Sequence, residues 1–159
     1  MKLREPVADD PSHTLRSHGI EYVGLDGEIG LLSVGAGETM ATMDLLEAAG
    51  GRAACFMDCS GGFGPDAMTA ALQRVRGLPG VRAVLINVFG GVTRVDDLAE
   101  SIATALKRLP GFSLPLVIRL EGNGADRGRD LLAGIGLRGF RILRDAVEAA
   151  VALAGKGER

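Results

Sequence analysis

Short apolar runs alternate with longer stretches of helical periodicity along this chain from Ile29 onward. The runs are bounded by glycine or polar residues and are rich in β-branched and other apolar side chains, which is typical of β-strands. They cover Ile29–Val34, Ala53–Asp58, Ala83–Val88, Leu116–Leu120 and Gly139–Leu143. Three of them are nearly all apolar, which predicts strands that helices cover on both faces.

Between these runs, apolar residues recur at every third or fourth position, the spacing of one buried helix face. The clearest case is Val95–Leu109, where Val95, Leu98 and Ile102 share that face. Four further helices are predicted, at Gly37–Ala49, at Pro65–Gly77, from after Asn123 to Gly136, and from about Asp145 to Ala154. Pro65 suits a first helical position, and Asn123 suits the cap before a helix.

The alternation of strands and helices predicts repeated βα units around a parallel sheet. Five units are too few for a barrel of eight, so the pattern favours a doubly wound, flavodoxin-like α/β fold with a five-stranded parallel sheet. The predicted domain covers residues 20–154. Residues 1–19, with Pro6, Pro11 and several charges, are expected to form an extended arm or a short helix, and residues 155–159 a frayed tail.

Composition narrows the class of protein without identifying its chemistry. The 159 residues are 47% hydrophobic and 24% charged, as expected for one globular domain with a core. The net charge is −2 and the lysines and arginines are scattered, which argues against a nucleic-acid partner. No apolar run approaches the roughly 20 residues that span a bilayer, and the amino terminus is polar, so we expect a cytoplasmic protein without a membrane partner.

Ligands of open parallel sheets bind beside the carboxyl ends of the strands, so the loops there are candidate sites. Four of them are rich in glycine or polar residues, at positions 35–37, 60–64, 89–93 and 121–124. In the third, Gly90 and Gly91 end a buried strand and lead into the strongest predicted helix. Their backbone allows close approach, and the free N–H groups at the helix start attract an anion such as phosphate or carboxylate. A tight turn without a ligand explains the same glycines equally well.

Other motifs give weaker hypotheses. The run Gly35-Ala36-Gly37 resembles the start of a dinucleotide-binding fingerprint, but Met40 stands at its third glycine position, and no Walker A motif occurs. His13 and His18 lie in the predicted arm without converging partners, so the sequence predicts neither a metal site nor a catalytic histidine, and we expect both on the surface.

The two cysteines, Cys55 and Cys59, lie four positions apart in one predicted strand. That spacing holds them beyond disulfide distance, so both are expected to be reduced thiols. The glycines beside Cys59 leave room for a lowered thiol pKa, but no cysteine-hydrolase signature surrounds it. A packed thiol is the preferred interpretation.

Two pairs of charged residues are further candidates. Arg119 and Glu121 lie two positions apart near a strand end, and Arg94 and Asp96 lie in the first turn of the strongest predicted helix. Each pair could orient a ligand or contact a partner subunit. A structural salt bridge or a helix cap explains the same charges at least as well.

Four motifs, in the same order and at the same intervals, resemble the carboxy-terminal domain of the β subunit of ADP- or GDP-forming succinate–CoA ligase. The resemblance spans about Asp10 to Ala154. The motifs are Tyr22–Gly30, Gly35-Ala36-Gly37 with Met40–Asp44, Val88–Gly91 with Arg94 and Asp96, and Arg119–Asn123.

The resemblance implies a role in a larger enzyme. In that family an ATP-grasp domain uses a nucleotide and magnesium to phosphorylate a histidine of the α subunit, and CoA displaces phosphate from an acyl phosphate to give the thioester. By resemblance, this chain contributes a "power helix" whose amino end faces the phosphohistidine, with Gly90 and Gly91 at the phosphate and Gly91, Val92 and Thr93 at the carboxylic acid substrate.

By the same resemblance, this chain supplies no catalytic residue and no metal ligand, and binds no cofactor alone. ATP, or GDP and GTP, together with Mg²⁺ and CoA, belong to the complete enzyme. The implied partners are an α-type subunit that carries the CoA-binding domain and the phosphohistidine, and an ATP-grasp domain or subunit.

Two departures from the family pattern concern substrate recognition. Val34 stands where the family usually has an asparagine that contributes to substrate binding, so binding of a dicarboxylate should weaken. The second loop reads Ser60-Gly61-Gly62-Phe63-Gly64 in place of a triple glycine, which is expected to reshape the pocket or a subunit contact.

A third departure is an absence: this sequence contains no ATP-grasp region, no CoA-binding domain and no histidine in a phosphorylation context. We therefore expect a subunit or an excised domain of a nucleoside-diphosphate-forming acyl-CoA synthetase that is inactive alone. The alternative is a binding or regulatory module of the same fold that has lost succinate recognition.

Overall fold

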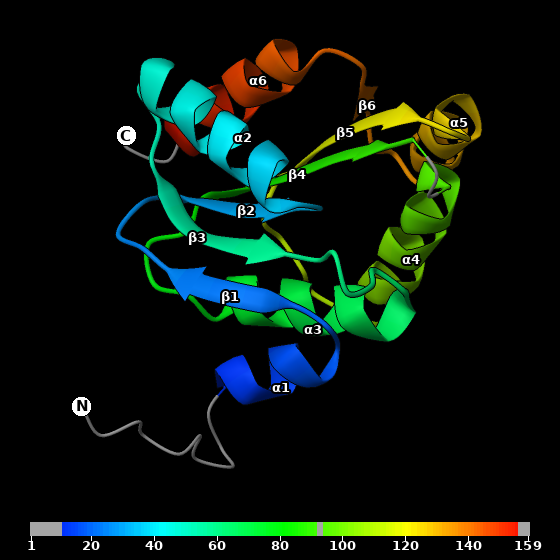
Figure 1. The fold of residues 1–159 in the computed structure, drawn as a ribbon, viewed down its shortest axis with the longest axis horizontal. Coiled ribbons are helices and arrows are strands. Elements are labelled where there is room, and N and C mark those ends of the chain that lie inside the picture. The colour runs from blue at the N-terminus through cyan, green and yellow to red at the C-terminus, as the bar shows by residue number, and fades with distance from the viewer. Residues whose placement is uncertain (1–10, 92–93, 156–159) are drawn as a thin grey trace.

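The computed structural model describes residues 11–91 and 94–155, which form one sheet of six strands flanked by six helices (Figure 1). The strands are β1 (Glu21–Gly24), β2 (Ile29–Ser33), β3 (Ala53–Asp58), β4 (Ala83–Gly90), β5 (Leu116–Gly122) and β6 (Gly139–Phe140). The helices are α1 (Pro11–Ser17), α2 (Ala36–Ala48), α3 (Pro65–Arg76), α4 (Val95–Arg108), α5 (Ala125–Gly134) and α6 (Leu143–Gly155). None of these six helices is both long and apolar enough to cross a membrane.

The strand order is β1-β3-β2-β4-β5-β6, and the strands from β2 to β6 run parallel. The predicted doubly wound, flavodoxin-like α/β class is thereby confirmed, and the five predicted parallel strands are all present, with one further strand at the edge. The sixth strand, β1, runs antiparallel to β3, with Glu21 opposite Asp58. β1 escapes sequence prediction because this edge strand is short and largely exposed, and so carries no apolar run.

Most predicted boundaries agree with the structure within one or two residues. The exception is the last strand, which was expected to reach Leu143. β6 contains Gly139 and Phe140 alone, and Leu143 begins α6. As the edge strand beyond β5, β6 pairs through Ile118–Gly139 and Arg119–Phe140 and then ends.

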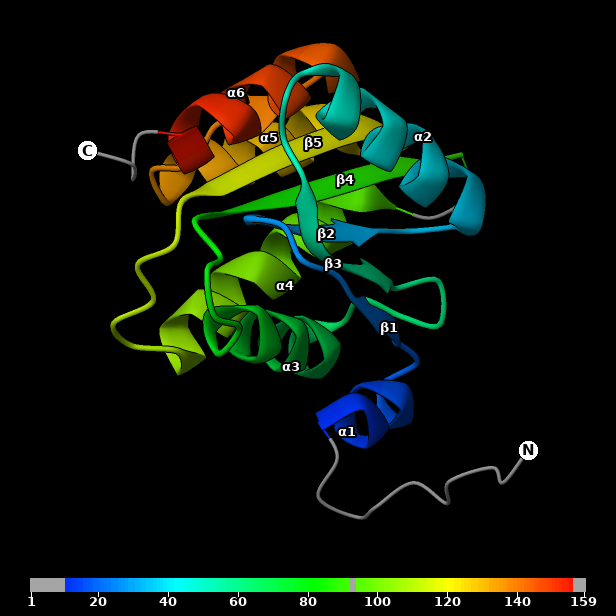
Figure 2. The same cartoon turned by 90° about the vertical axis from the view of Figure 1, so that its left-hand side faces the viewer.

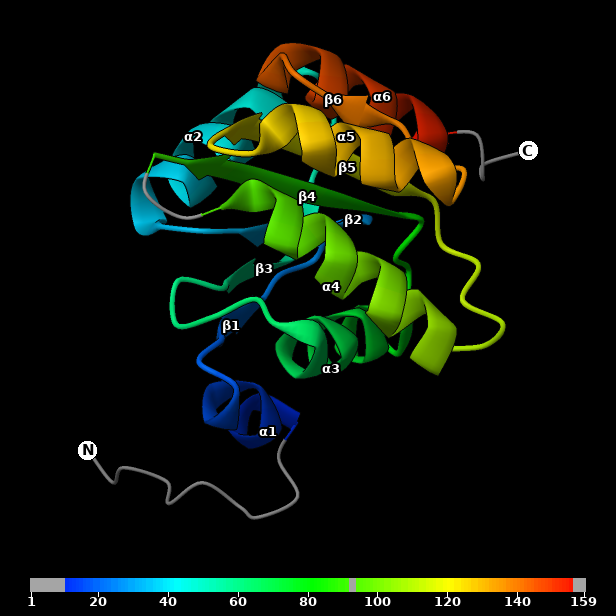
Figure 3. The same ribbon diagram turned by 90° about the vertical axis from the view of Figure 1, so that its right-hand side faces the viewer.

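The helices α3 and α4 cover one face of the sheet, and α2 and α6 cover the other (Figures 2 and 3). Alternate residues of the parallel strands pack into two cores, one on each face. Leu32 and Ile86 belong to the core that includes residues of α3 and α4. Their neighbours Leu31 and Leu85 belong to the core that includes residues of α2 and α6. The carboxyl-terminal edge of the sheet therefore has two different surroundings, one on each face.

Part of the predicted arm packs on the domain. Residues 1–10 lie outside the described residues, but Pro11–Ser17 form α1, which agrees with the short-helix alternative. Leu15 of α1 and Ile20 are almost fully buried in the α3 and α4 core. Of the predicted tail, Gly155 is the last residue of α6, and residues 156–159 lie outside the described residues.

Candidate functional site

The glycine-rich loops meet at one edge of the sheet, as the parallel arrangement predicts, because β2, β3, β4 and β5 all point to the same side (Figure 1). Backbone contacts tie the loops after β2 and β3 together. The Gly35 N–H donates to Asp58 Oδ1 at 3.0 Å, and the Cys59 N–H donates to the Ser33 carbonyl at 2.8 Å. The candidate site is thus one continuous edge.

The loops after β4 and β5 are clamped to each other. The Asn123 N–H donates to the Gly90 carbonyl and the Val95 N–H donates to the Asn123 carbonyl, both at 2.9 Å. Gly122 has φ +112°, and a Cβ at this position would lie 1.9 Å from the Gly90 carbonyl oxygen. Only glycine fits this position, so the backbone clamp determines where α4 begins.

The predicted side-chain cap by Asn123 is wrong. Gly124, in a left-handed conformation, is the residue before α5, and no side chain caps that helix. Asn123 instead supports the start of α4 through its backbone carbonyl. The close approach of the two loops explains the difference, because it places Asn123 beside α4 rather than at the start of α5.

At the predicted anion loop, Gly90 is buried as the last residue of β4, and Gly91 is exposed. Among the residues that the structure describes, none has an atom within 4 Å of a Cβ built at Gly91, and the φ of Gly91 lies outside the left-handed region. The backbone of Gly91 is therefore open to approach from outside the described part of the chain. Val92 and Thr93, the other predicted substrate-loop residues, lie outside the described residues.

The first turn of α4 holds a buried ion cluster. The Asp96 side chain is fully buried and accepts hydrogen bonds from Arg94 Nε at 3.1 Å, Arg94 Nη2 at 2.8 Å and Arg127 Nη1 at 2.7 Å. These hydrogen bonds, from Arg94 first, lower the pKa of Asp96 to about 2. Arg127 also pairs with Glu100. The salt-bridge interpretation of Arg94 and Asp96 is confirmed, and Asp96 is held ionised.

On the α2 and α6 face, the row of the sheet at the last residues of β2 and β3 is polar. Ser33 lies opposite Asp58 on one side and Asn87 on the other, and Asn87 lies opposite Arg119. One step deeper the row is apolar, with Leu31 opposite Phe56 and Leu85, and Leu85 opposite Val117. The change from apolar to polar at the carboxyl ends is the pattern of a binding edge.

Hydrogen bonds connect this polar row to α2. Asn87 Nδ2 donates to Glu38 Oε2 at 3.0 Å and to Thr42 Oγ1 at 2.8 Å, while Arg119 Nη1 donates to Asn87 Oδ1 at 3.3 Å. The Arg119 guanidinium also lies 5.7 Å from the ring centre of Phe89, which is half exposed. Asn87 thus links the α2 carboxylate to the β5 guanidinium.

Sequence reasoning missed Asn87 and Glu38. The signal for Asn87 is a single amide inside the apolar run of β4, while Glu38 gives no signal because acidic residues are common in the first turn of any helix. Arg119 and Glu121 each have partners of their own: Arg119 Nε donates to the Arg141 carbonyl, and Glu121 Oε1 accepts from the Gly122 N–H.

Val34, the predicted substrate-binding position, faces the other side of the sheet. Its side chain is partly buried against the α3 and α4 core, as is that of Phe63. Val34 and Phe63 line one small apolar space together with Val88 and Leu98, and that space has no room for a water molecule. The two departures from the family pattern are therefore neighbours in the fold.

Comparison with known proteins decides the family. The model of the CoA-ligase family matches residues 32–153. The chain belongs to the CoA-ligase family. It is 43% identical over 157 residues to the β subunit of an ADP-forming succinate–CoA ligase from Chloroflexus aurantiacus, covering 98% of this chain and 41% of the relative. It is 41% identical over 154 residues to a probable malate–CoA ligase β subunit from Mesorhizobium japonicum, covering 95% and 39%.

Solved structures agree on the fold of this CoA-ligase chain. An ATP citrate lyase from Methanothrix soehngenii, in complex with citrate and coenzyme A, superposes with a TM-score of 0.74 at 13% identity, covering 96% of this chain and 49% of that one. An acetyl-coenzyme A synthetase from Korarchaeum cryptofilum, in complex with phosphate and ADP, gives 0.66 at 16% identity, covering 81% and 33%. The chain spans less than half the length of each of these four proteins.

The remaining candidates in this CoA-ligase chain carry no reactive group. Cys55 and Cys59 are free and buried, which confirms the reduced, packed thiols. Burial raises the thiol pKa of Cys55 to about 11, and burial with the nearby Asp58 raises that of Cys59 to about 12. His13 is exposed. Within residues 11–91 and 94–155, no three His, Cys, Asp or Glu side chains are grouped so as to hold a metal ion.

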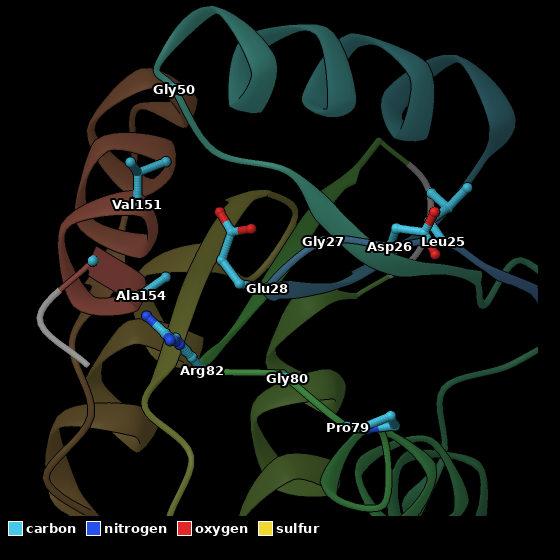
Figure 4. A pocket seen from close by; sticks show the side chains of 11 residues that line it. Leu25, Asp26, Gly27, Glu28, Gly50, Pro79, Gly80, Arg82, Val151 and Ala154 are labelled. Carbon is cyan, nitrogen blue, oxygen red and sulfur yellow. The ribbon is translucent and has the colours of Figure 1, made fainter. Parts of the chain in front are cut away.

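A cavity of about 540 Å³ lies at the opposite edge of the sheet, beside the amino ends of β2 and β4 (Figure 4). Glu28 and Arg82 extend into it near α6, where Val151 and Ala154 form the wall. Ligands of doubly wound sheets bind at the carboxyl ends of the strands. Despite its size, this cavity is therefore a weaker candidate than the edge formed by the glycine loops.

Proposed function

We propose that this chain is a component of a nucleoside-diphosphate-forming acyl-CoA synthetase. In this proposal Gly90, Gly91 and the amino end of α4 hold the phosphate of a phosphohistidine on an α-type subunit, and the same loop holds the carboxylic acid substrate. The observation that carries the proposal is the position of Gly91, which is exposed at the carboxyl-terminal edge of the sheet between the end of β4 and the amino end of α4. The names of the curated relatives support the reaction class.

The ion cluster in α4 supports an anion site. A carboxylate in the first turn of a helix offsets the positive end of the helix dipole and repels an incoming phosphate. Asp96 is such a carboxylate, but Arg94 and Arg127 both donate to it. The two guanidinium groups therefore offset the charge of Asp96, while Asp97, which is exposed in the same turn, keeps its own carboxylate. Arg94 is about half exposed, so its positive charge remains near the loop.

The proposed division of labour leaves the other chemistry to partner domains. The nucleotide, whether ATP or GTP, and Mg²⁺ are assigned to an ATP-grasp domain or subunit, and CoA to the α-type subunit. Phosphate or carboxylate binding needs only backbone N–H groups and guanidinium groups, which this edge offers at Gly91, Arg94 and Arg119. This chain would hold the reacting groups in place, which is a contribution of orientation rather than of proton transfer.

Reconstitution tests the proposal. The chain is combined with an α-type subunit and an ATP-grasp protein, and association is followed by size-exclusion chromatography, with nucleotide hydrolysis measured with and without acid and CoA. We expect a complex whose hydrolysis requires both the acid and CoA. Failure to associate with either protein contradicts the proposal.

A second candidate function is a binding or regulatory module. The apolar side chains of Val34 and Phe63 favour it, because both line one small space that has no room for a water molecule. The same reconstitution separates the two functions. A stable complex that shows no hydrolysis dependent on acid and CoA supports the regulatory module, whereas turnover supports the synthetase component.

A further inference from the structure

Two features on opposite faces of the site edge bear on the acid that the site accepts. On the α3 and α4 face, Val34 and Phe63 close the edge with apolar side chains and leave no room for water. A charged group placed there would lose its hydration without gaining a hydrogen bond. The small space lined by Val34 and Phe63 is therefore unsuited to a carboxylate.

On the α2 and α6 face, the site edge carries a carboxylate of its own. Glu38 is half-buried in the first turn of α2, and its Oε2 accepts a hydrogen bond from Asn87 Nδ2 at 3.0 Å. Asn87 Oδ1 in turn accepts from Arg119. One amide group thus separates the Glu38 carboxylate from the Arg119 guanidinium, so a ligand that reaches Arg119 also lies near Glu38.

The charges of this face are unfavourable for two carboxylates. In the polar row described above, Arg119 and Asp58 carry opposite charges, and Glu38 of α2 adds a second carboxylate beside the row. The N–H groups of Gly35 and Ser60 already donate to Asp58 Oδ1, each at 3.0 Å. When one acid group of a ligand binds the Gly91 loop, a second carboxylate that reaches Arg119 lies near Glu38, and like charges at short distance repel.

We propose that this site accepts a short monocarboxylic acid and rejects dicarboxylic acids, with Glu38 as the specificity-determining residue. The inference rests on the proposed function for the assignment of the edge to an acid. A hydroxyl group at the far end of the acid can donate to the Glu38 carboxylate, while a carboxylate at the same place is repelled. The preferred substrate class is therefore a monocarboxylate with an uncharged tail, best with a terminal hydroxyl.

Three acids with carbon chains of the same length test this specificity: succinate, butyrate and 4-hydroxybutyrate. Each is titrated into the isotope-labelled chain, and the backbone N–H signals of Gly35 and Gly90 and the Arg119 Nε–H signal are followed by NMR. We expect 4-hydroxybutyrate to bind at least about tenfold more tightly than succinate, with butyrate between them. Equal affinities, tighter binding of succinate, or no response to any acid would overturn the inference.

Glu38→Gln isolates the charge, because glutamine keeps an acceptor for Asn87. In this variant, succinate should bind within about threefold of 4-hydroxybutyrate. Glu47→Gln is the matched control, since it removes the same charge from an exposed position near the end of the same helix, and its selectivity should equal that of the unmodified chain. Unchanged selectivity in Glu38→Gln contradicts the role of Glu38.

The reconstituted complex separates this inference from the proposed function. Turnover with succinate as the best acid would contradict the inference and leave the synthetase function standing. If the chain binds monocarboxylates selectively but does not associate with its partners, the inference stands and the synthetase function is contradicted.

Discussion

The two faces of the sheet reach the carboxyl-terminal edge in different ways. On the α3 and α4 face, the loops after β4 and β5 are joined by backbone: the Asn123 N–H donates to the Gly90 carbonyl, and the Val95 N–H at the start of α4 donates to the Asn123 carbonyl. On the α2 and α6 face, the connection is made by side chains, through the hydrogen bonds from Arg119 to Asn87 and from Asn87 to Glu38.

This difference separates two tasks. Backbone contacts place atoms accurately but cannot distinguish one ligand from another by charge, so they suit an anion that every member of a family must bind. Side-chain networks can change with single substitutions, so they suit the variable end of a substrate. The comparison predicts that substitutions on the α3 and α4 face displace the loop that is proposed to bind the anion. Substitutions on the α2 and α6 face should change the selectivity among acids.

Gly122→Ala should break the backbone face most severely. The new Cβ would lie 1.9 Å from the Gly90 carbonyl oxygen, at a φ of +112° that alanine avoids. We expect the free energy of unfolding to fall by about 3–5 kcal/mol, measured by chemical denaturation. Gly134→Ala is the control at the end of α5, because its Cβ would meet nothing within 4 Å. If the two variants have equal free energies of unfolding, the loops after β4 and β5 accommodate the added methyl group without loss of stability.

Gly91→Asp tests the anion position on the same face. A carboxylate at the start of α4 would occupy the place proposed for phosphate and would repel the phosphate itself. The kcat/KM of the reconstituted enzyme should therefore fall at least about a hundredfold. Gly91→Ala should lower kcat/KM less than Gly91→Asp, because its Cβ narrows the approach to the backbone without adding a negative charge. Both variants should keep the unmodified melting temperature. Full activity of Gly91→Asp would mean that the loop is only a turn.

Asp96→Asn measures the ion cluster that supports α4. The pKa of Asp96 in the folded chain is about 2, below the ordinary 3.8, because Arg94 and Arg127 donate to its carboxylate. The ionised group therefore stabilises the fold above about pH 4, and this contribution disappears as the pH falls through about 2. The unmodified chain should be more stable than Asp96→Asn at neutral pH, and the difference should shrink over that acid range. Asp97→Asn, at an exposed position in the same turn, should show no such narrowing.

The sequence predicted the parallel βα core, with the buried faces of its helices, because repeated apolar spacing encodes burial directly. It predicted the glycine loops for a related reason, since glycine marks places where the backbone must turn or be approached. It did not predict the polar row, because Ser33, Asn87 and Arg119 come from different strands and only the sheet register brings them together. It did not predict β1, because that strand has no apolar run. It did not place Val34 and Phe63 at one shared space, because the two positions are far apart in sequence.

The smallest expected effect comes from making the α3 and α4 face polar. Val34→Asn alone places an amide against Phe63, where it should cost about 1 kcal/mol of unfolding free energy. The pair Val34→Asn with Phe63→Gly also removes the aromatic ring and opens a place for the amide to meet a ligand. We expect succinate to bind about threefold more tightly to the pair than to the unmodified chain in the same NMR titration. Phe63→Gly alone supplies the control, since it opens the space without a hydrogen-bonding group. If the single and double variants bind succinate alike, the amide adds nothing at this position, and the selectivity of the edge rests on the α2 face alone.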